Sequence, residues 1–268
     1  MAAFRTFDAR FQKRHAGPAG SQADYHSCAV TANPLEWLAM LDEATVRQLL
    51  EPLGLSLSSD QIGQLTAYLE LLLRWNRKIN LTGIRDAQSC VSRHFGESLY
   101  LGRWVDLKGR LLDIGSGAGF PGLCLKIIFP DLSVTLLEPV AKKRAFLKEA
   151  ARVCGMNLVE VRRERLEDIA CLAAPPVYDA ATARAVGHLE ELVPLASRCL
   201  KSGGELFLWL SRRQASELGY LGGEMREVRR VTVPGGGGGQ IWWGRKPSED
   251  ARGVEGRGST DCSANRMC

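Results

Sequence analysis

The 268-residue sequence lacks several features that would place it in a common class of protein. No apolar run approaches the ~20 residues that a membrane-spanning helix needs, and residues 1–39 contain no apolar segment like that of a secretory signal peptide. The eight cysteines never form Cys-x-x-Cys and have no paired histidines near them, so neither a zinc site nor a redox pair is expected. We therefore expect a cytoplasmic protein without a membrane partner and without a bound metal ion.

A strong excess of charge of one sign is also missing. The sequence has 35 Lys and Arg residues against 30 Asp and Glu residues, a net charge of only +5. Binding of a nucleic acid would therefore depend on local clusters of basic residues, because such clusters supply affinity for phosphate groups. Clusters of this kind occur at Arg74, Arg77 and Lys78, at Lys142, Lys143 and Arg144, at Arg162, Arg163 and Arg165, and at Arg212 and Arg213.

The two ends of the chain differ from its middle. Residues 1–39 contain a Gly-Pro-Ala-Gly-Ser stretch and follow no helical or strand periodicity, and residues 245–268 are polar and equally aperiodic. We expect both segments to be disordered extensions. Met40 opens a helical pattern, and we interpret it as the true start or the edge of the folded part. The sequence thus predicts an N-terminal helical unit over residues 40–100 and a second domain over residues 101–244.

A helical pattern followed by alternating strands and helices makes up the middle of the chain. Between Ser59 and Thr82, apolar residues recur at helical spacing behind the capping candidates Ser58, Ser59 and Asp60. Five short apolar runs then alternate with helical patterns, at residues 111–114, 133–137, 158–161, 179–182 and 205–210. Two last runs, residues 228–233 and 240–244, flank a proline and five glycines and are typical of a hairpin that adds an antiparallel edge. The pattern predicts an α/β protein with a doubly wound, mostly parallel sheet of seven strands behind an N-terminal helical unit.

The most specific motif joins the first predicted strand to a helix and reads Leu-Leu-Asp-Ile-Gly-Ser-Gly-Ala-Gly-Phe-Pro-Gly at residues 111–122. It is not a phosphate loop, because Leu123 and Cys124 stand where such a loop has Lys and Ser or Thr. A dinucleotide fingerprint is weakened, because position 120 is Phe where that fingerprint has Gly. The remaining pattern, Asp-x-Gly-x-Gly-x-Gly, resembles motif I of the class I S-adenosylmethionine-dependent methyltransferases.

This resemblance implies S-adenosylmethionine as the cofactor and indicates which residues would bind it. Asp113 would bind the cofactor's ammonium group, directly or through water, and the glycines would let the backbone approach its ribose and amino-acid end. Glu138 ends the next strand, 23 residues beyond Gly115, where such folds place an acid for the ribose hydroxyls. The loop after the third strand usually covers the adenine, which points to Glu164 and the backbone of Arg165. The predicted cofactor site comprises Asp113, Gly115, Gly117, Gly119, Phe120, Glu138, Glu164, Arg165 and Arg184.

Four motifs in a fixed order narrow the resemblance. They are Trp-Asn-Arg-Lys-Ile-Asn-Leu-Thr at residues 75–82, Arg-His-Phe-Gly-Glu-Ser at 93–98, Gly-Phe-Pro-Gly at 119–122 and Ala-Arg-Ala at 183–185. Together they resemble the bacterial 16S rRNA guanine-N7 methyltransferase family, also called glucose-inhibited division protein B. The resemblance implies a monomeric enzyme with a Rossmann-like methyltransferase sheet. It also implies methylation of N7 of guanine 527 in 16S rRNA, with the RNA or the 30S ribosomal subunit as partner and no DNA partner.

Methylation of guanine N7 needs no general base, which fits the absence of other catalytic motifs from the sequence. N7 carries a lone pair and no proton, so it can attack a sulfonium methyl group without a general base, and positioning and desolvation supply most of the catalysis. Methylation of an exocyclic amine or of pyrimidine C5 calls for motifs that are absent after the fourth strand, which reads Thr-Ala-Arg-Ala at residues 182–185. The resemblance makes Arg184 and His94 the candidate catalytic residues. Arg184 would contact a phosphate or the guanine edge, and Arg93 with His94 would close over cofactor or RNA.

Two positions depart from the family pattern. Glu97 stands where the family's Arg-His-x-x-Asp-Ser has Asp, which preserves the charge but adds a methylene. The fifth strand ends Trp-Leu-Ser-Arg-Arg at residues 209–213, where many members have a Leu-Lys-Gly-like sequence, so the lysine is absent. Two other hypotheses therefore stay open: a class I methyltransferase that acts on a protein or a small molecule, and an RNA-binding module that has lost transferase activity.

Overall fold

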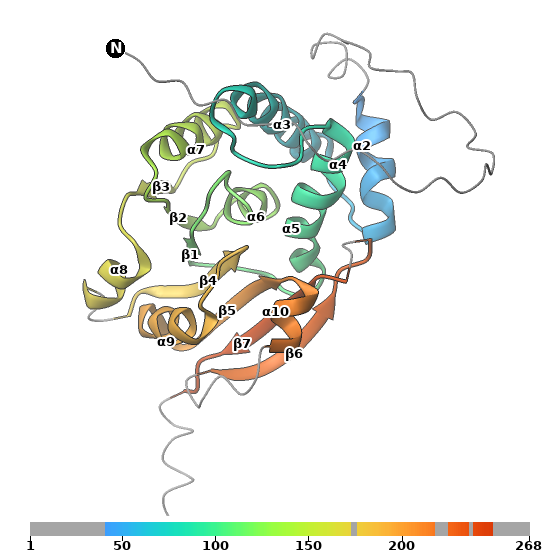
Figure 1. The fold of residues 1–268 in the computed structure, drawn as a ribbon. Helices are drawn as coiled ribbons and strands as arrows, with labels where there is room; N and C mark the ends of the chain where they lie inside the picture. The colour runs from blue at the N-terminus through green and yellow to red at the C-terminus, as the bar shows by residue number, and fades with distance from the viewer. Residues whose placement is uncertain (1–40, 173–175, 218–224, 236–237, 249–268) are drawn as a thin grey trace, which may run out of the picture. The chain divides into compact units, whose positions relative to one another are not determined.

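Seven strands form one sheet in the computed structural model, in the order β3-β2-β1-β4-β5-β7-β6 (Figure 1). Strands β1 to β5 pair in parallel, and β7 runs antiparallel to its neighbours β5 and β6. The structure describes residues 41–172, 176–217, 225–235 and 238–248. The predicted doubly wound, mostly parallel α/β sheet is confirmed, including the antiparallel pair at its edge.

The strands coincide with the apolar runs of the sequence. They are β1 (Arg110–Ile114), β2 (Ser133–Leu137), β3 (Val159–Arg162), β4 (Tyr178–Arg184), β5 (Leu200–Leu210), β6 (Arg226–Thr232) and β7 (Gln240–Arg245). Because side chains alternate along a strand, β1 serves both faces of the sheet. Leu111 joins one hydrophobic cluster, and Leu112 and Ile114 join a second one.

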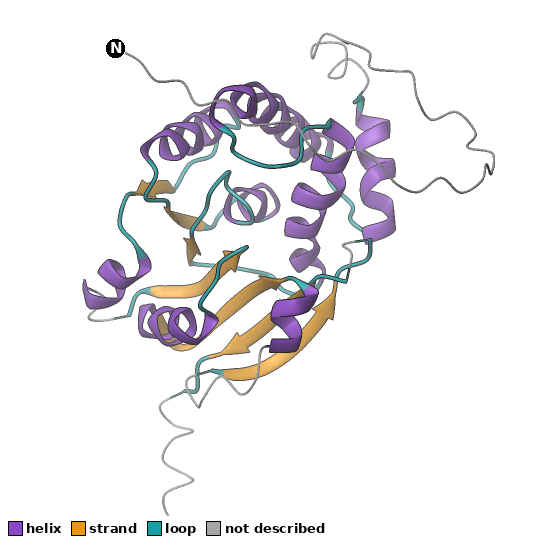
Figure 2. Cartoon of the chain, in the orientation of Figure 1, coloured by secondary structure: helices purple, strands orange, loops and turns teal. Residues whose placement is uncertain are grey.

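Helices cover both sides of the strands (Figure 2). They are α2 (Glu43–Leu50), η1 (Glu51–Leu53), α3 (Ser59–Ile79), α4 (Ala87–Ser89), the π-helix η2 (Cys90–Gly96), α5 (Glu97–Leu99), η3 (Tyr100–Arg103), α6 (Gly122–Ile128), α7 (Ala141–Val153), α8 (Leu166–Leu172), α9 (Leu189–Cys199) and α10 (Arg212–Glu217). The first cluster holds residues of α3, α6 and α7, and the second holds residues of α8 and α9. These two sets of helices therefore lie on opposite faces of the sheet.

Helix α3 begins at Ser59, as the sequence predicts, and ends at Ile79, three residues before the predicted end at Thr82. Ser58 caps it reciprocally: the Ser58 Oγ accepts from the Gln61 N–H at 3.2 Å, and the Gln61 side chain accepts from the Ser58 N–H at 2.9 Å. The helix stops at Asn80, whose left-handed conformation ends the hydrogen-bond ladder. Its predicted apolar stripe is buried at Leu65 and Leu72, among others.

The predicted helical unit, residues 40–100, shares its core with the sheet. A single cluster joins Leu65 of α3 and Phe95 of η2 to Leu111 of β1 and Leu136 of β2. Residues 41–100 therefore pack as part of the same body as the strands.

The predicted N-terminal extension, residues 1–39, lies outside the described residues, as does most of the predicted tail, residues 245–268. The first residues of that tail belong to the fold. Arg245 ends β7 and pairs with Glu205 at 2.6 Å, and Lys246 donates to two backbone carbonyls at the α9–β5 junction. Within the part of the chain that the structure describes, no helix is long and apolar enough to cross a membrane.

Candidate functional site

The glycine loop, residues 115–121, joins the carboxyl end of β1 to α6 near the middle of the sheet. Gly115 and Gly117 have φ angles of 68° and 56°, which other residues rarely adopt. Chain neighbours aside, a Cβ atom on Gly115 would come no closer than 3.4 Å to another residue, and one on Gly117 no closer than 3.8 Å. The backbone at these two positions therefore adjoins open space, where a bound molecule could approach it.

Gly119 is a glycine for a different reason. Its φ angle is 87°, and a Cβ atom there would collide with the hydroxyl of Tyr68 and approach Leu123 to 2.7 Å. The structure thus places Gly119 against the core, whereas Gly115 and Gly117 face outward.

Glu138 follows β2 and holds the glycine loop from the neighbouring strand. Its Oε2 accepts a hydrogen bond from the Gly117 N–H at 3.0 Å, and its Oε1 accepts one from the Val140 N–H at 2.8 Å. The side chain is only 4% exposed. Each carboxylate oxygen keeps a further lone pair, so Glu138 can also accept hydrogen bonds from the hydroxyl groups of a ligand beside the loop.

Asp113 lies in β1 directly before the glycine loop. Its Oδ1 accepts a hydrogen bond at 2.8 Å from the hydroxyl of Thr182, its partner in register on β4. Its Oδ2 is buried without a hydrogen-bond partner among the described residues. Burial raises the pKa of Asp113 to about 6, although the hydrogen bond from Thr182 and the nearby polar groups of Ser116 and the Gly122 backbone oppose the rise. A buried acceptor without a donor is costly, so this oxygen suits a cationic donor or a bridging water.

Glu164 and Arg165 follow β3, the strand next to β2. The Oε1 of Glu164 accepts from Arg162 Nη2 at 3.0 Å, and this hydrogen bond is the largest cause that lowers the pKa of Glu164 to about 2. The N–H of Arg165 donates to Asp168 Oδ2 at 3.0 Å, in the first turn of α8. Glu164 is therefore ionised at neutral pH, at the strand end where the adenine is expected.

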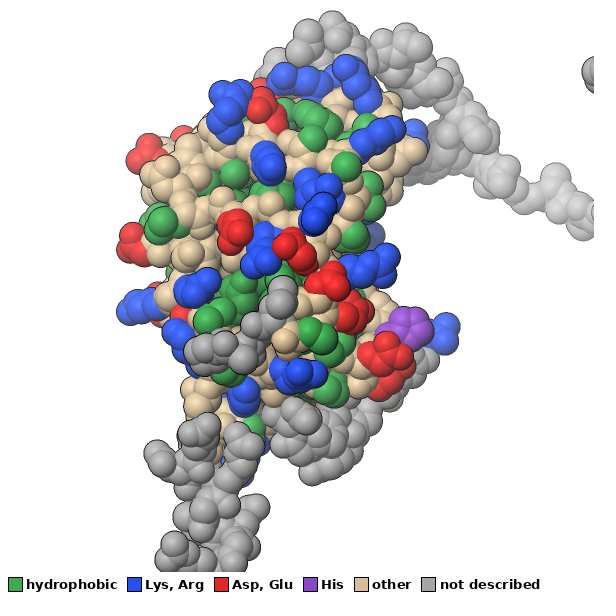
Figure 3. Space-filling model, turned by 90° about the vertical axis from the view of Figure 1, so that its left-hand side faces the viewer, with side chains coloured by type: hydrophobic (Ala, Val, Ile, Leu, Met, Phe, Trp, Pro, Cys, Tyr) green, Lys and Arg blue, Asp and Glu red, His purple; other side chains and the backbone are tan. Residues whose placement is uncertain are grey.

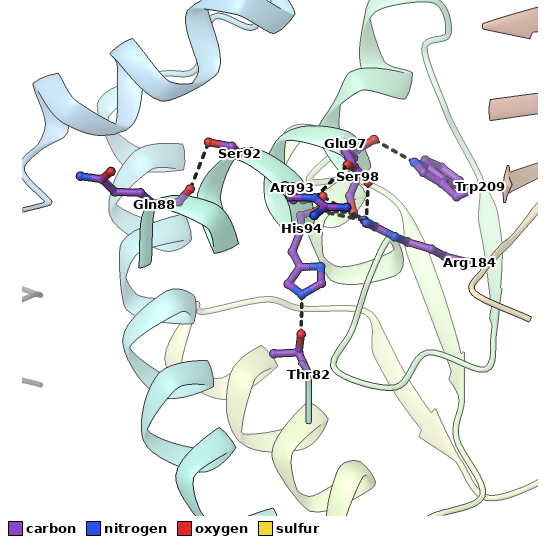
Figure 4. A network of polar contacts seen from close by, with 9 residues as sticks. All are labelled: Thr82, Gln88, Ser92, Arg93, His94, Glu97, Ser98, Arg184 and Trp209. Carbon is purple, nitrogen blue, oxygen red and sulfur yellow. Dashed lines mark hydrogen bonds and ion pairs between the residues drawn. The ribbon is translucent and has the colours of Figure 1, made fainter. Parts of the chain in front are cut away.

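Arg184 ends β4, and its guanidinium is held by η2 and α5 (Figure 4). Nη1 donates to the carbonyl of His94 at 3.2 Å and to Ser98 Oγ at 3.1 Å. Nη2 donates to the carbonyl of Arg93 at 3.1 Å and to Glu97 Oε2 at 2.6 Å. The sequence predicts that this guanidinium contacts RNA or the guanine edge; the structure engages both of its terminal nitrogens within the protein.

His94 lies between Thr82 and the glycine loop. Its Nε2 shares a hydrogen bond with the Thr82 hydroxyl (Figure 4), and its ring stacks on Phe120 with the centroids 4.9 Å apart. Burial, and then the nearby charges of Arg184 and Arg93, lower the pKa of His94 to about 4. The ring is therefore neutral at physiological pH, and its Nε2 is already committed to Thr82.

Sequence reasoning missed three polar residues that shape this region: Tyr68, Asn76 and Thr182. The Tyr68 hydroxyl donates to the carbonyl of Ala118 in the glycine loop. The Asn76 side chain donates to the Thr82 carbonyl and accepts from the Thr82 N–H, both at 2.9 Å, which fixes that turn. A signal was present for Thr182, which puts a polar atom in an otherwise apolar buried strand, where a polar group needs a partner.

The predicted basic clusters are exposed to different degrees. Arg162 is paired with Glu164, and Arg144 donates to the Glu138 carbonyl at 3.0 Å. The exposed members are Arg74, Arg77, Lys78, Lys142, Arg163, Arg165, Arg212 and Arg213. In the view of Figure 3, Lys and Arg side chains are spread from the top to the bottom of this face, with Asp and Glu side chains among them. Helix α7 begins just after Glu138, which holds the glycine loop. The exposed Lys142 on this helix is therefore close in sequence to Glu138.

Comparison with known proteins gives a consistent match. The family model described as rRNA small subunit methyltransferase G matches residues 61–230. The ribosomal RNA small subunit methyltransferase G of Chloroflexus aggregans is 41% identical over 191 residues, which cover 68% of this chain and 80% of the relative. The protein of the same name from Halorhodospira halophila is 40% identical over 172 residues, or 64% of this chain and 80% of the relative. Among solved structures, precorrin-6y C5,15-methyltransferase from Geobacter metallireducens has a TM-score of 0.43 and 17% identity, covering 57% of this chain and 87% of that one.

Proposed function

Because the chain belongs to the rRNA small subunit methyltransferase G family, we propose that it methylates N7 of a guanine in 16S rRNA, at position 527 by family resemblance. The chain is an S-adenosylmethionine-dependent rRNA methyltransferase. One observation carries the proposal for the site: the carboxyl ends of β1 and β2 bring together the outward glycines of the loop, the carboxylate of Glu138 and the unpartnered oxygen of Asp113.

The residues present fit the cofactor. Glu138 offers lone pairs to hydroxyl groups, and Asp113 offers a buried oxygen that lacks a donor. We assign Glu138 to the ribose hydroxyls, Asp113 to the ammonium group, directly or through water, and Glu164 with the backbone of Arg165 to the adenine. When bound, S-adenosylmethionine supplies a methyl group activated by a positively charged sulfur. The protein's part is to hold cofactor and acceptor in line and to exclude water.

Guanine N7 can be methylated without a base or a nucleophile from the protein, because its lone pair is free and no proton has to be removed. His94 is bound to Thr82 and is not placed as a base. Cys124, next to the glycine loop in sequence, is buried, and burial raises the pKa of its thiol well above the usual value. In the described part of the chain, neither group is prepared for the base or the nucleophile that other nucleobase positions require.

We further propose that the substrate is 16S rRNA or the 30S subunit and that the chain acts as a monomer in the cytoplasm. Exposed cations on α3 and at the start of α7 support an RNA partner, since phosphate contacts supply most of the affinity for nucleic acids. Affinity for the RNA is therefore expected to fall as the salt concentration rises.

The test uses the purified chain, labelled S-adenosylmethionine and 30S subunits from cells that lack the modification. N7-methylguanine is mapped by borohydride reduction and aniline cleavage of the 16S rRNA. We expect one enzyme-dependent cleavage, which is absent with the loop variant Gly117→Val. Cofactor binding without transfer would favour the RNA-binding module, and transfer to a protein or a small molecule would favour the other methyltransferase.

A further inference from the structure

Tyr68 is a fully buried residue of α3 that reaches the glycine loop from inside the fold. Its side chain is 0% exposed, and its hydroxyl donates a hydrogen bond to the carbonyl of Ala118. Its ring lies nearly parallel to that of Phe120, with an interplanar angle of 13° and centroids 5.6 Å apart. One side chain thus contacts the loop on both sides of Gly119, from a helix 50 residues earlier in the chain.

The fit between Tyr68 and the glycine loop leaves no space for a side chain at position 119. A Cβ atom on Gly119 would collide with the Tyr68 hydroxyl. The Gly119 N–H donates to the carbonyl of Ser116 at 2.6 Å and closes a turn within the loop. The inner side of the loop is therefore shaped against Tyr68, while Gly115 and Gly117 form its outer side.

Two further rings, those of His94 and Phe95, complete this contact. His94 stacks on Phe120 at 4.9 Å, and Phe95 meets Phe120 edge-on at 5.1 Å and 87°. Phe95 also meets Tyr68 edge-on at 5.0 Å. Offset-stacked and edge-on arrangements are the ones that aromatic pairs prefer. The four rings, here called the aromatic support, link α3 and η2 to the glycine loop.

We propose that Tyr68 is a positioning residue for cofactor binding: its hydroxyl holds the glycine loop in the conformation that receives S-adenosylmethionine, without contact with the cofactor. This rests on the proposed function, since the loop is the proposed cofactor site. Tyr68 holds the Ala118 carbonyl on the inner side, and Glu138 holds the Gly117 N–H on the outer side at 3.0 Å. Without the hydroxyl, a carbonyl in a buried residue would lose its donor, and the loop would shift to satisfy it.

The test is Tyr68→Phe in the full chain, with Tyr178→Phe as the matched control. Tyr178 is also buried, at 2% exposure, but it begins β4, at the opposite end of the sheet from the glycine loop. Titration calorimetry gives the Kd for S-adenosylmethionine, steady-state kinetics give KM and kcat, and hydrogen exchange across residues 115–121 reports on the loop in the cofactor-free protein.

We expect Tyr68→Phe to raise Kd and KM for the cofactor about fivefold to tenfold, to leave kcat within about twofold, and to speed exchange in the loop. Tyr178→Phe should change none of these quantities. An unchanged Kd and exchange rate in Tyr68→Phe would overturn the proposal, even with a lower melting temperature, because the hydroxyl would then stabilise only the fold. A wild-type chain that binds no S-adenosylmethionine would refute the proposed function itself, and this proposal with it, before any variant is compared.

Discussion

Arg184→Ala is predicted to destabilise the fold, because the Arg184 guanidinium ties the end of β4 to η2 and α5. It donates to Glu97 at 2.6 Å and also satisfies the backbone carbonyls of Arg93 and His94. The side chains of Arg184 and Glu97 are 16% and 15% exposed. Burial raises the pKa of Glu97, and the charge of Arg184 opposes that rise. Alanine would therefore take the nearer cation from a mostly buried carboxylate, because Arg93 lies farther away, at 3.9 Å. It would also remove one donor from each of two carbonyls, of which that of His94 keeps the Ser98 hydroxyl at 2.6 Å.

The expected loss follows from this geometry. Removal of one partner from a buried ion pair costs about 3–5 kcal/mol. The lower end applies here, because Glu97 can take up a proton once Arg184 is gone and because water reaches part of the pair. We therefore expect the free energy of unfolding to fall by about 3 kcal/mol. In a folded part of this size, each kcal/mol lowers Tm by about 2–4 °C, so Tm should fall by about 6–12 °C.

Thermal unfolding followed by circular dichroism at neutral pH measures this loss in Arg184→Ala, Glu97→Gln and the double variant. The single effects should not add, and we expect a coupling of about 1 kcal/mol or more between the two groups. Arg184→Lys should recover less than half of the loss, because an ammonium cannot reproduce the planar fork of the guanidinium. A Tm for Arg184→Ala within about 2 °C of the wild type, together with lost methyl transfer, would refute this reasoning and assign the guanidinium to RNA or cofactor.

Three further predictions concern cofactor binding, each measured by titration calorimetry. Gly117→Val should raise the Kd for S-adenosylmethionine about tenfold or more, because a branched side chain is strained at a φ of 56° and fills the open space beside the loop; a wild-type Kd would contradict the loop assignment. Glu138→Gln keeps the shape of the side chain but loses the negative charge that accepts from the Gly117 N–H, so the Kd for S-adenosylmethionine should rise about tenfold. The control Glu167→Gln changes an exposed site on α8 and should leave this Kd unaltered. The pKa of Asp113 is about 6, and the ionised form is the one that attracts an ammonium group. Affinity should therefore fall as the pH drops below 6, by up to about tenfold per pH unit. Asp113→Asn should abolish this dependence, and a flat wild-type profile would show that the ammonium group does not use this carboxylate.

The glycine loop and Glu138 could be predicted because their constraints are local in the sequence. Positive φ angles favour glycine, and a strand followed by a carboxylate is visible without knowledge of the fold. Because the carboxyl ends of neighbouring parallel strands meet at one edge, the parallel order then brings Glu138 to Gly117.

The environment of Arg184 could not be predicted in the same way. Its partners lie 86 to 91 residues earlier in the chain, and two of them are backbone carbonyls, which no residue type reveals. A guanidinium at a strand end looks the same in sequence whether it faces RNA or the protein. Gly119 shows a related limit, since its motif position is that of a cofactor glycine and only the packing reveals Tyr68 beneath it.

The hydrophobic cluster shared by the helices and the sheet also joins the two ends of the described chain. It includes Leu41, at the start of the described chain, and Ile241 of β7, near its end. Trp209 of β5 reaches back to donate to the carbonyl of Glu97 at 2.8 Å. Because domains fold as units while the chain is synthesised, the cluster that also holds Tyr68, Phe95 and Phe120 is complete only once β7 has been made. We therefore expect the glycine loop to reach its full stability only in a chain whose synthesis has passed β7.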